Sequence, residues 1–255
     1  MNKFSIQASM VARPINITLI GAGGNGSATL KNLFQMDYLL RKLSDDSVYL
    51  NVTVYDDDTV SHTNLGRQGF WPIDLGQFKS DVLVSRYNTH GLLNWKSKTL
   101  RFDSSSLFSS TLPDILITCV DKASVRVELG QALASSERSS DMLWLDLGND
   151  KNAGNIILGH AFNRENKLPN VFDLYPQLVD VEDIEEDSCS HFEAMQRQSF
   201  GVNDKMAIEA TCLLWKLLRE GAIDYHGAYV DLEQATVKPL KINPLNWAIL
   251  GYAAA

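Results

Sequence analysis

Acidic, amide and cationic side chains follow one another closely between residues 55 and 79 of this chain. Asp56 ends an apolar run, where a carboxylate can accept hydrogen bonds from the hydroxyls of a ribose. Asn64, Arg67 and Gln68 come within the next dozen residues, and Lys79 follows them. Arginine can hold phosphate oxygens through two parallel hydrogen bonds, whereas lysine acts as a point charge. Two such cations indicate a ligand with more negative charge than a pyrophosphate bridge, and a nucleoside triphosphate meets that requirement.

A glycine-rich stretch, GAGGNG at residues 21–26, precedes these side chains. It lies between a short β-branched run and a segment with helical spacing, which is the context that makes such a motif meaningful. Glycines allow the backbone to approach phosphate oxygens, and the first N–H groups of the helix supply positive potential. The phosphate-binding candidates are Gly21, Gly23, Gly24 and Gly26. Taken alone, the motif fits any mononucleotide or dinucleotide binder, or a tight turn without a ligand.

A further carboxylate, Asp121, ends the apolar run DILITCVD. Ligands of open α/β sheets bind beside the carboxyl ends of the strands. A carboxylate that faces phosphates there would repel them unless a divalent cation lies between, and Mg²⁺ held by one carboxylate plus phosphate oxygens is a common arrangement. Alternatively, Asp121 caps the helix that we expect to start near Ala123. Arg126, one turn into that helix, would form an ion pair with Asp121.

The elements that must position these residues alternate along the first part of the chain. Apolar runs predict strands, and segments with 3.6-residue periodicity predict helices between them. The expected strands are residues 15–21, 48–56, 95–102, 114–121, 142–148 and 155–162, and the expected helices are 27–43, 79–91 and 123–134. Such alternation indicates parallel strands with helices on both faces of the sheet.

The character of the chain changes after residue 162. Residues 163–202 are polar, acidic and weakly periodic, and we expect a long crossover loop there. A helix follows, with Asp204 as its N-cap and Gly221 just beyond its end. Residues 227–242 predict an antiparallel hairpin at the edge of the sheet. The expected fold is therefore α/β, a Rossmann-like three-layer single domain over residues 1–255, whose mixed sheet has a parallel N-terminal half and antiparallel C-terminal strands.

Composition excludes several classes of function. The formal net charge of −8 argues against nucleic-acid binding, and no run approaches the roughly 20 apolar residues that span a membrane. The three cysteines, Cys119, Cys189 and Cys212, form no CxxC pair, so we expect no zinc site and a cytoplasmic location. Cys119 and Cys212 read as core residues. The acidic residues 180–193 indicate a solvated loop or a docking surface for a basic partner.

The ordered motifs resemble one family. GAGGNG, DDDTVSHTNLGRQ, the lysine of GQFK and CVDKASVR, in this order, are similar to the ThiF/MoeB/HesA family and to the adenylation domains of ubiquitin-activating enzymes. The later segment DSCSHFEAMQRQSFGVND most resembles ThiF-family proteins of PRTRC plasmid gene sets. The resemblance implies a homodimeric enzyme that uses ATP and Mg²⁺ to adenylate the C-terminal glycine carboxylate of a small ubiquitin-like β-grasp protein and releases pyrophosphate.

The resemblance also assigns roles to residues. It places the four glycines, Asn64, Arg67 and Lys79 on the phosphates, Asp56 on the ribose and Asp121 on the metal ion. Asp58 and Gln68 belong to the same nucleotide-binding motifs. Some members of the family transfer the activated partner to a cysteine, so Cys189 is either a thioester-forming residue or an ordinary loop cysteine beside Asp187. Two other readings remain open, an NAD(P)-dependent oxidoreductase and a catalytically silent nucleotide-binding scaffold.

Overall fold

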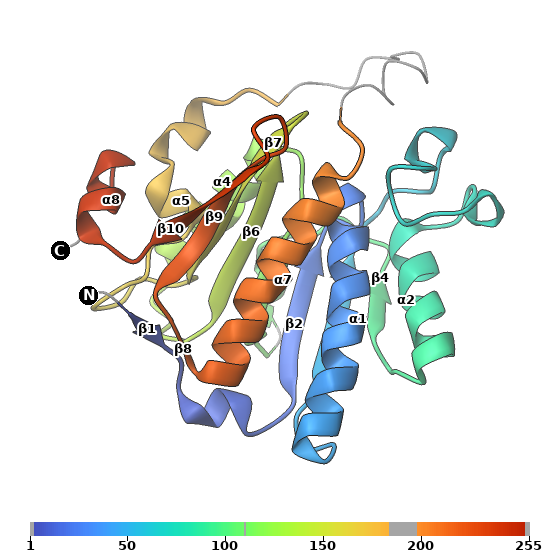
Figure 1. Cartoon of the computed structure of the whole chain (residues 1–255), viewed down its shortest axis with the longest axis horizontal. Coiled ribbons are helices and arrows are strands. Elements are labelled where there is room, and N and C mark those ends of the chain that lie inside the picture. The colour runs from blue at the N-terminus through green and yellow to red at the C-terminus, as the bar shows by residue number, and fades with distance from the viewer. Residues whose placement is uncertain (1–2, 110, 184–197, 253–255) are drawn as a thin grey trace.

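The computed structural model describes residues 3–109, 111–183 and 198–252. Its main feature is a mixed sheet of eight strands (Figure 1). The strands are β2 (Ile15–Ile20), β3 (Leu50–Tyr55), β4 (Lys96–Lys98), β5 (Ile115–Thr118), β6 (Leu143–Asn149), β7 (Ala153–His160), β9 (Tyr225–Asp231) and β10 (Thr236–Lys241). Their order in the sheet is β10-β9-β7-β6-β5-β2-β3-β4.

The two halves of the sheet differ in strand direction, as the sequence predicts. β2 pairs in parallel with β3 and β5, β4 extends the parallel set beside β3, and β6 does so beside β5. From β7 onward every pairing is antiparallel, and β9 and β10 form the expected terminal hairpin. The chain leaves β2 toward β3 and later returns on the other side as β5, so that the carboxyl end of β2 is a topological switch point.

Helices cover both faces of the sheet. One face carries α1 (Gly24–Ser44), α2 (Lys79–Gly91) and α7 (Val202–Glu220), while α4 (Ala123–Ala134) and α5 (Val171–Leu174) lie behind the strands (Figure 1). The remaining short elements are β1 (Phe4–Ser5), η1 (Ala8–Val11), η2 (His62–Asn64), η3 (Pro72–Asp74), α3 (Ser105–Ser109), η4 (Pro176–Asp180), β8 (Ala222–Ile223) and α8 (Pro244–Ile249). The three-layer arrangement confirms the expected fold class.

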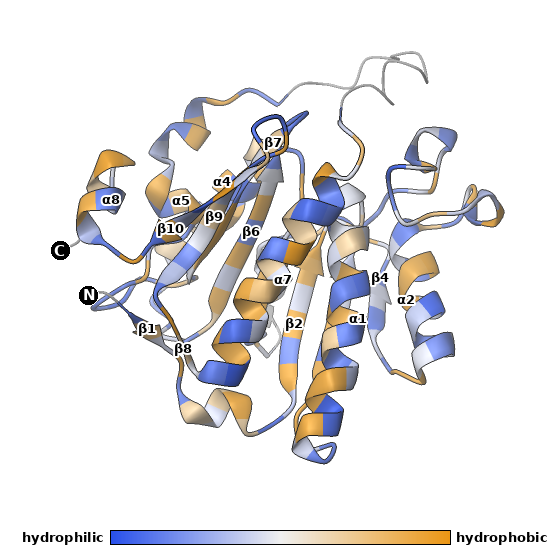
Figure 2. Cartoon of the chain, in the orientation of Figure 1, coloured by the Kyte–Doolittle hydropathy of each residue, from blue (hydrophilic) through white to orange (hydrophobic). Residues whose placement is uncertain are grey.

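The helix α7 packs through the apolar face that its periodicity predicts. Met206, Ala210 and Leu214 are fully buried, and hydrophobic and hydrophilic residues alternate in bands along α1 and α7 (Figure 2). Gly221 adopts a positive φ just after the last turn, as expected. The predicted N-cap is wrong, because Gly201 occupies that position and Asp204 lies inside the first turn.

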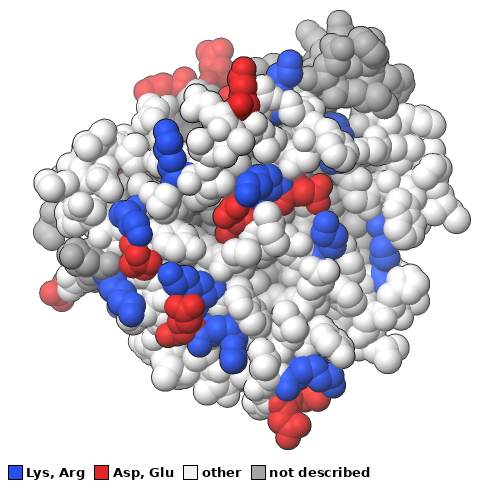
Figure 3. Space-filling model, in the orientation of Figure 1, with Lys and Arg blue, Asp and Glu red and all other residues white. Residues whose placement is uncertain are grey.

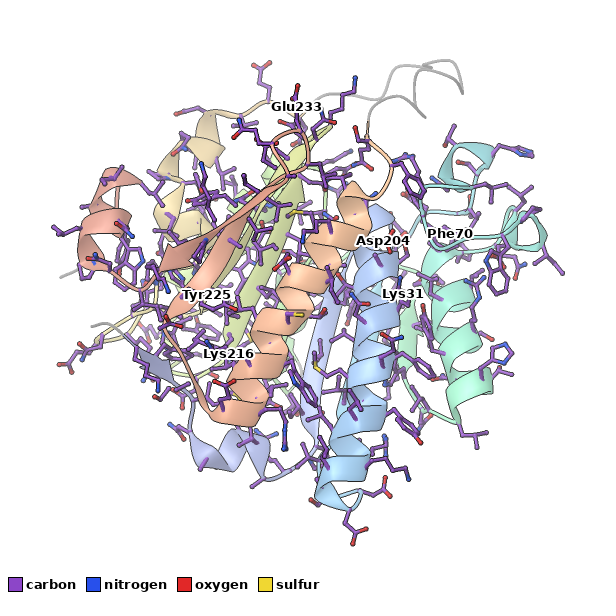
Figure 4. All side chains as sticks on the ribbon, viewed as in Figure 1. Lys31, Phe70, Asp204, Lys216, Tyr225 and Glu233 are labelled. Carbon is purple, nitrogen blue, oxygen red and sulfur yellow. The ribbon has the colours of Figure 1, made fainter. Side chains whose placement is uncertain are left out.

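Asp204 instead forms an ion pair of 3.0 Å with Lys31 of α1, the neighbouring helix (Figure 4). Similar pairs distribute basic and acidic side chains over the same face of the molecule (Figure 3). The expectation for Cys212 is also wrong, because this thiol is exposed on α7, whereas Cys119 is buried at the end of the parallel strands as predicted.

Part of the expected loop 163–202 is ordered structure. The short helices α5 and η4 lie within it, and Leu168 and Leu174 are fully buried against the sheet. Weak periodicity conceals these elements because each is a single turn or little more. Residues 184–197, which include most of the acidic segment and Cys189, lie outside the described residues. Within the described residues, no helix is long and apolar enough to cross a membrane.

Candidate nucleotide-binding site

A cavity of about 620 Å³ lies at the carboxyl ends of the parallel strands, a volume typical of small-ligand sites. It brings together residues that are far apart in the sequence. The predicted site residues that line it are Gly21, Gly23, Gly24, Asp56, Asp58, Asn64, Arg67, Gln68, Lys79 and Asp121. Gly26 is not among the lining residues, and Cys189 falls outside the described residues.

The glycines of the loop serve two different purposes. A Cβ at Gly26 would lie 1.9 Å from the carbonyl oxygen of Gly21, and one at Gly21, which has a φ of +89°, would lie 2.7 Å from the carbonyl oxygen of Cys119. These two positions need glycine because the backbone packs too closely for a side chain. A Cβ at Gly23 would meet only the Gln68 amide, at 3.9 Å. Gly23 therefore leaves open space in front of the first turn of α1, where a phosphate can approach the N–H groups.

Asp56 is held at the end of β3 by the glycine loop itself. The backbone N–H of Ala22 donates to its Oδ2 at 2.5 Å, and the N–H of Asp58 donates to its Oδ1 at 3.0 Å. Burial raises the pKa of the Asp56 carboxyl above its ordinary value, although the Ala22 hydrogen bond and the charge of Lys79 act in the opposite direction. The β3 end and the phosphate loop are thus one connected unit.

Lys79 lies at the start of α2 and points back toward the same strand end. Its Nζ lies 2.7 Å from Oδ2 of Asp58, and only 9% of its side chain is exposed, compared with 68% for Asp58. A nearly buried ammonium that keeps one carboxylate partner at the rim of a cavity has a fixed position. It can therefore offer its remaining hydrogens to an anion inside the cavity.

The loop after β3 supplies the amides and the second cation. Asn64 accepts a hydrogen bond from the Ser61 N–H at 2.8 Å, which closes the turn that carries it. The Nε of Arg67 donates to the carbonyl oxygen of Thr63 at 3.1 Å, and its Nη1 donates to Oε1 of Gln198 at 3.0 Å. Among the described residues, the buried Oε1 of Gln68 has no hydrogen-bond partner. A buried acceptor at a cavity wall is satisfied once a donor of a ligand or a water enters.

Asp121 and Arg126 are arranged differently from the expectation. Arg126 does not pair with Asp121; its Nε lies 2.8 Å from Oδ1 of Asp146 in β6, and its Nη2 donates to the carbonyl oxygens of Val120 and Leu147. Asp121 itself is exposed in the cavity wall. The pairing with β6 could not be foreseen, because Asp146 lies on an apolar strand 20 residues further along the chain.

The first turn of α4 takes its cap from elsewhere. Asp183, which comes long after this helix in the sequence, accepts the N–H of Ser124 at 3.2 Å, and Lys122 stands at the N-cap without a side-chain hydrogen bond to the helix. The alternative in which Asp121 caps α4 is therefore wrong. Asp121 keeps its carboxylate on the cavity side.

The cavity has a limited capacity for metal ions. Within the described residues, no group of three or more His, Cys, Asp or Glu side chains could hold an ion by itself. A single carboxylate at the wall, Asp121, fits a Mg²⁺ ion that takes its other ligands from phosphates and water.

Several lining residues were missed by the sequence reasoning. Asn25, Asn149, Gln198 and Asn203 bring further amides to the wall, and Arg101 and Lys122 bring further cations. Asn25 donates to Oδ1 of Asn149 at 2.7 Å, which joins the glycine loop to the end of β6. No local pattern marks Gln198 or Asn203, since both come from the C-terminal third of the chain and reach the cavity only through the packing of α7 on α1.

Solved structures with a similar fold include a structure of E. coli MccB with ATP, with a TM-score of 0.61 and 13% sequence identity over 91% of this chain and 65% of that chain. The microcin C7 biosynthetic enzyme MccB with N-formylated MccA gives a TM-score of 0.61 and 15% identity over 90% of this chain and 65% of that one. A structure of PaaA gives a TM-score of 0.60 and 13% sequence identity over 89% of this chain and 64% of that chain. The chain thus spans slightly less than two thirds of each structure, and at these identities the likeness concerns the fold.

No curated protein sequence matches the chain significantly. The model of the ThiF family matches residues 7–140, which include the glycine loop, both cations and Asp121. Since this match covers more than half of the chain, the protein belongs to the ThiF family.

Proposed function

We propose that the protein binds ATP in the cavity at the carboxyl ends of β2, β3 and β5 and adenylates a carboxylate of a peptide or protein substrate. The observation that carries this proposal is the common position of Arg67 and Lys79, which line one cavity together with Gly23 and Gly24. Membership of the ThiF family supports it. Further support comes from the similarly folded structures of MccB with ATP and of MccB with N-formylated MccA.

The reaction requires neutralisation of charge more than covalent help from the protein. A carboxylate oxygen of the substrate forms a bond to the α-phosphorus of ATP, and the bond between that phosphorus and the β-phosphate oxygen breaks, so that pyrophosphate leaves with the electron pair. Two anions must approach one another, and negative charge develops on the leaving group. Arg67 and Lys79 stabilise that charge, and the N–H groups at the start of α1 hold the phosphates in place.

The other residues orient the nucleotide. Asp56 accepts hydrogen bonds from the ribose hydroxyls, a role that its anchored position at the end of β3 supports. Asn64 and Gln68 contribute amide hydrogen bonds, and Asp58 keeps Lys79 in position. A Mg²⁺ ion held by Asp121 would neutralise phosphate charge when bound.

The substrate is a small ubiquitin-like protein with a C-terminal glycine, and the enzyme acts as a homodimer; both statements extend the family resemblance to this chain. A relation to PRTRC gene sets stays a prediction. Cys189 would accept the activated partner as a thioester in this scheme. The whole chain, including residues 163–202, would act as one adenylating domain.

ATP–pyrophosphate exchange with candidate small proteins that end in glycine tests the function. We expect exchange with the wild type and a loss of ~10²–10³ in rate for Arg67→Ala and for Asp121→Ala, because each removes charge stabilisation in the transition state. Circular dichroism of both variants checks that the fold is intact. Unchanged exchange in both would remove the site assignment.

Thermal-shift titrations separate this function from the other readings. MgATP should stabilise the protein in preference to NADH, since a dinucleotide leaves Arg67 and Lys79 without a phosphate partner. Selective stabilisation by NADH would favour an oxidoreductase. Stabilisation by ATP without exchange, across all partners that end in glycine, would favour a silent scaffold.

A further inference from the structure

A chain of hydrogen bonds joins Arg67 to the beginning of α7. Oε1 of Gln198 accepts from Nη1 of Arg67 at 3.0 Å and also from Nδ2 of Asn203 at 3.0 Å. The same Nδ2 lies 3.4 Å from the carbonyl oxygen of Arg67. One side-chain oxygen of Gln198 therefore fixes the guanidinium, and Asn203 fixes Gln198.

Asn203 is itself firmly placed. Asn203 is only 6% exposed. A Cβ added at Gly24 would lie 2.4 Å from the Nδ2 of Asn203. The amide thus packs directly on the first residue of α1, in the space that the glycine leaves. The helix α7 lies along α1, with its start beside the glycine loop (Figure 1). The packing of these two helices therefore holds the side-chain amides of Asn203 and Gln198 at one side of the cavity.

We propose that Gln198 is a positioning residue for Arg67, which aims the guanidinium at the β- and γ-phosphates of the bound nucleotide. This inference rests on the proposed function. An arginine side chain has several rotatable bonds and loses much entropy when it is immobilised. Contacts at Nε with Thr63 and at Nη1 with Gln198 hold it before the nucleotide arrives. Preorganisation of this kind lowers the cost of binding.

The neutral amide is well suited to this task. A carboxylate at the same place would hold Arg67 more strongly, but it would cancel the positive charge that the phosphates need. An amide oxygen accepts the hydrogen bond and leaves the net charge of the guanidinium intact. Gln198 lies outside the matched family segment, residues 7–140, so this contact is a feature of the C-terminal part of this chain.

The test measures the binding of ATP and AMP by isothermal titration calorimetry. Gln198→Met keeps the length of the side chain and removes the acceptor, while Gln198→Glu keeps the acceptor and adds a negative charge. Gln198→Met should bind ATP roughly tenfold or more weakly, the cost of one hydrogen bond to a charged group. Gln198→Glu keeps that bond and should also bind ATP more weakly, because its carboxylate offsets the positive charge of Arg67. Both should bind AMP as the wild type does, because AMP lacks the phosphates that Arg67 contacts.

Ser199→Ala is the matched control. Ser199 is the next residue and donates a hydrogen bond to Asn152, away from Arg67; its loss should leave the ATP and AMP affinities unchanged. If Gln198→Met weakens the binding of ATP and of AMP equally, Gln198 has a merely structural role and the proposal is overturned. Wild-type affinity for ATP in that variant would overturn it as well. Failure of the wild type to bind ATP would overturn the proposed function and this inference together.

Discussion

The guanidinium of Arg126, a residue of the cavity wall, and the carboxylate of Asp146 form an ion pair with 2.8 Å between Nε and Oδ1 and with both side chains almost closed to solvent. Thr118 also donates to Oδ1 of Asp146, and Trp144 donates to the Thr118 hydroxyl. The pair therefore ties α4 to β6 and, through Thr118, to the end of β5. Its arginine holds the carbonyl oxygen of Val120, the residue before Asp121.

Arg126→Met should lower the free energy of unfolding by about 3–5 kcal/mol, because it leaves the Asp146 charge buried without a partner. Urea denaturation measures the change. Arg13→Met is the matched control: Arg13 pairs with Asp114 at 2.6 Å, but its side chain is 48% exposed, so we expect a loss of less than about 1 kcal/mol. Similar losses in the two variants would contradict the role of burial.

Stability should fall as the pH is lowered from 6.5 toward 4, because burial lowers the pKa of His160 and of His226 to about 4. Nε2 of His226 accepts the indole N–H of Trp247 at 2.8 Å, which leaves no place for a second proton. The unfolded chain takes up the proton first, at its ordinary pKa near 6.5. The stabilisation is complete above that pH and is lost as the pH approaches 4, by up to about 3 kcal/mol for each histidine.

Denaturation curves between pH 7.5 and 4.5 measure this dependence. His226→Gln should be less stable at pH 7.5 and should show a shallower slope over the interval, because one of the two buried groups no longer titrates. An unchanged free energy of unfolding over this interval in the wild type would contradict the predicted titration.

Substitutions in the glycine loop should separate packing from ligand binding. Gly26→Ala should cost about 3 kcal/mol or more of stability, because the new Cβ would lie 1.9 Å from a backbone oxygen. Gly23→Ala should cost less than about 1 kcal/mol, since its Cβ meets only a flexible amide at 3.9 Å. The same Cβ occupies the space that a phosphate needs, so thermal stabilisation by ATP should be lost in Gly23→Ala. A stable Gly23→Ala protein with undiminished ATP binding would place the phosphates elsewhere.

Lys79→Met should lower ATP–pyrophosphate exchange by ~10²–10³, because a cation at the phosphates is removed. Asp58→Asn should lower it by less than about tenfold, since the exposed Asp58 acts by holding the ammonium at 2.7 Å. The Asp58→Asn substitution has no further effect once Lys79 is replaced, because Asp58 then has no ammonium group to position. The double variant should therefore match Lys79→Met. A rate for the double variant well below that of Lys79→Met would indicate that Asp58 contacts the nucleotide directly.

Local patterns determined the elements and the strand directions of this protein. The alternation of apolar runs and helical periodicity predicted β2 through β7 and the three main helices, because burial of one face imposes a period on the sequence. The order of the glycine loop, the acids and the two cations predicted their meeting at one edge of the sheet, since parallel strands bring their carboxyl ends together.

The tertiary structure decided which side chains touch across elements. Arg126 pairs with Asp146 and not with Asp121, Asp183 caps α4, and Gln198 reaches Arg67 from 131 residues away. Hydrophobic periodicity states which face of an element is buried, but not which polar group of a distant segment will oppose it. That choice depends on how α7 packs along α1 and how α4 packs on the sheet, because a buried polar group is stable only where the packing brings it a partner.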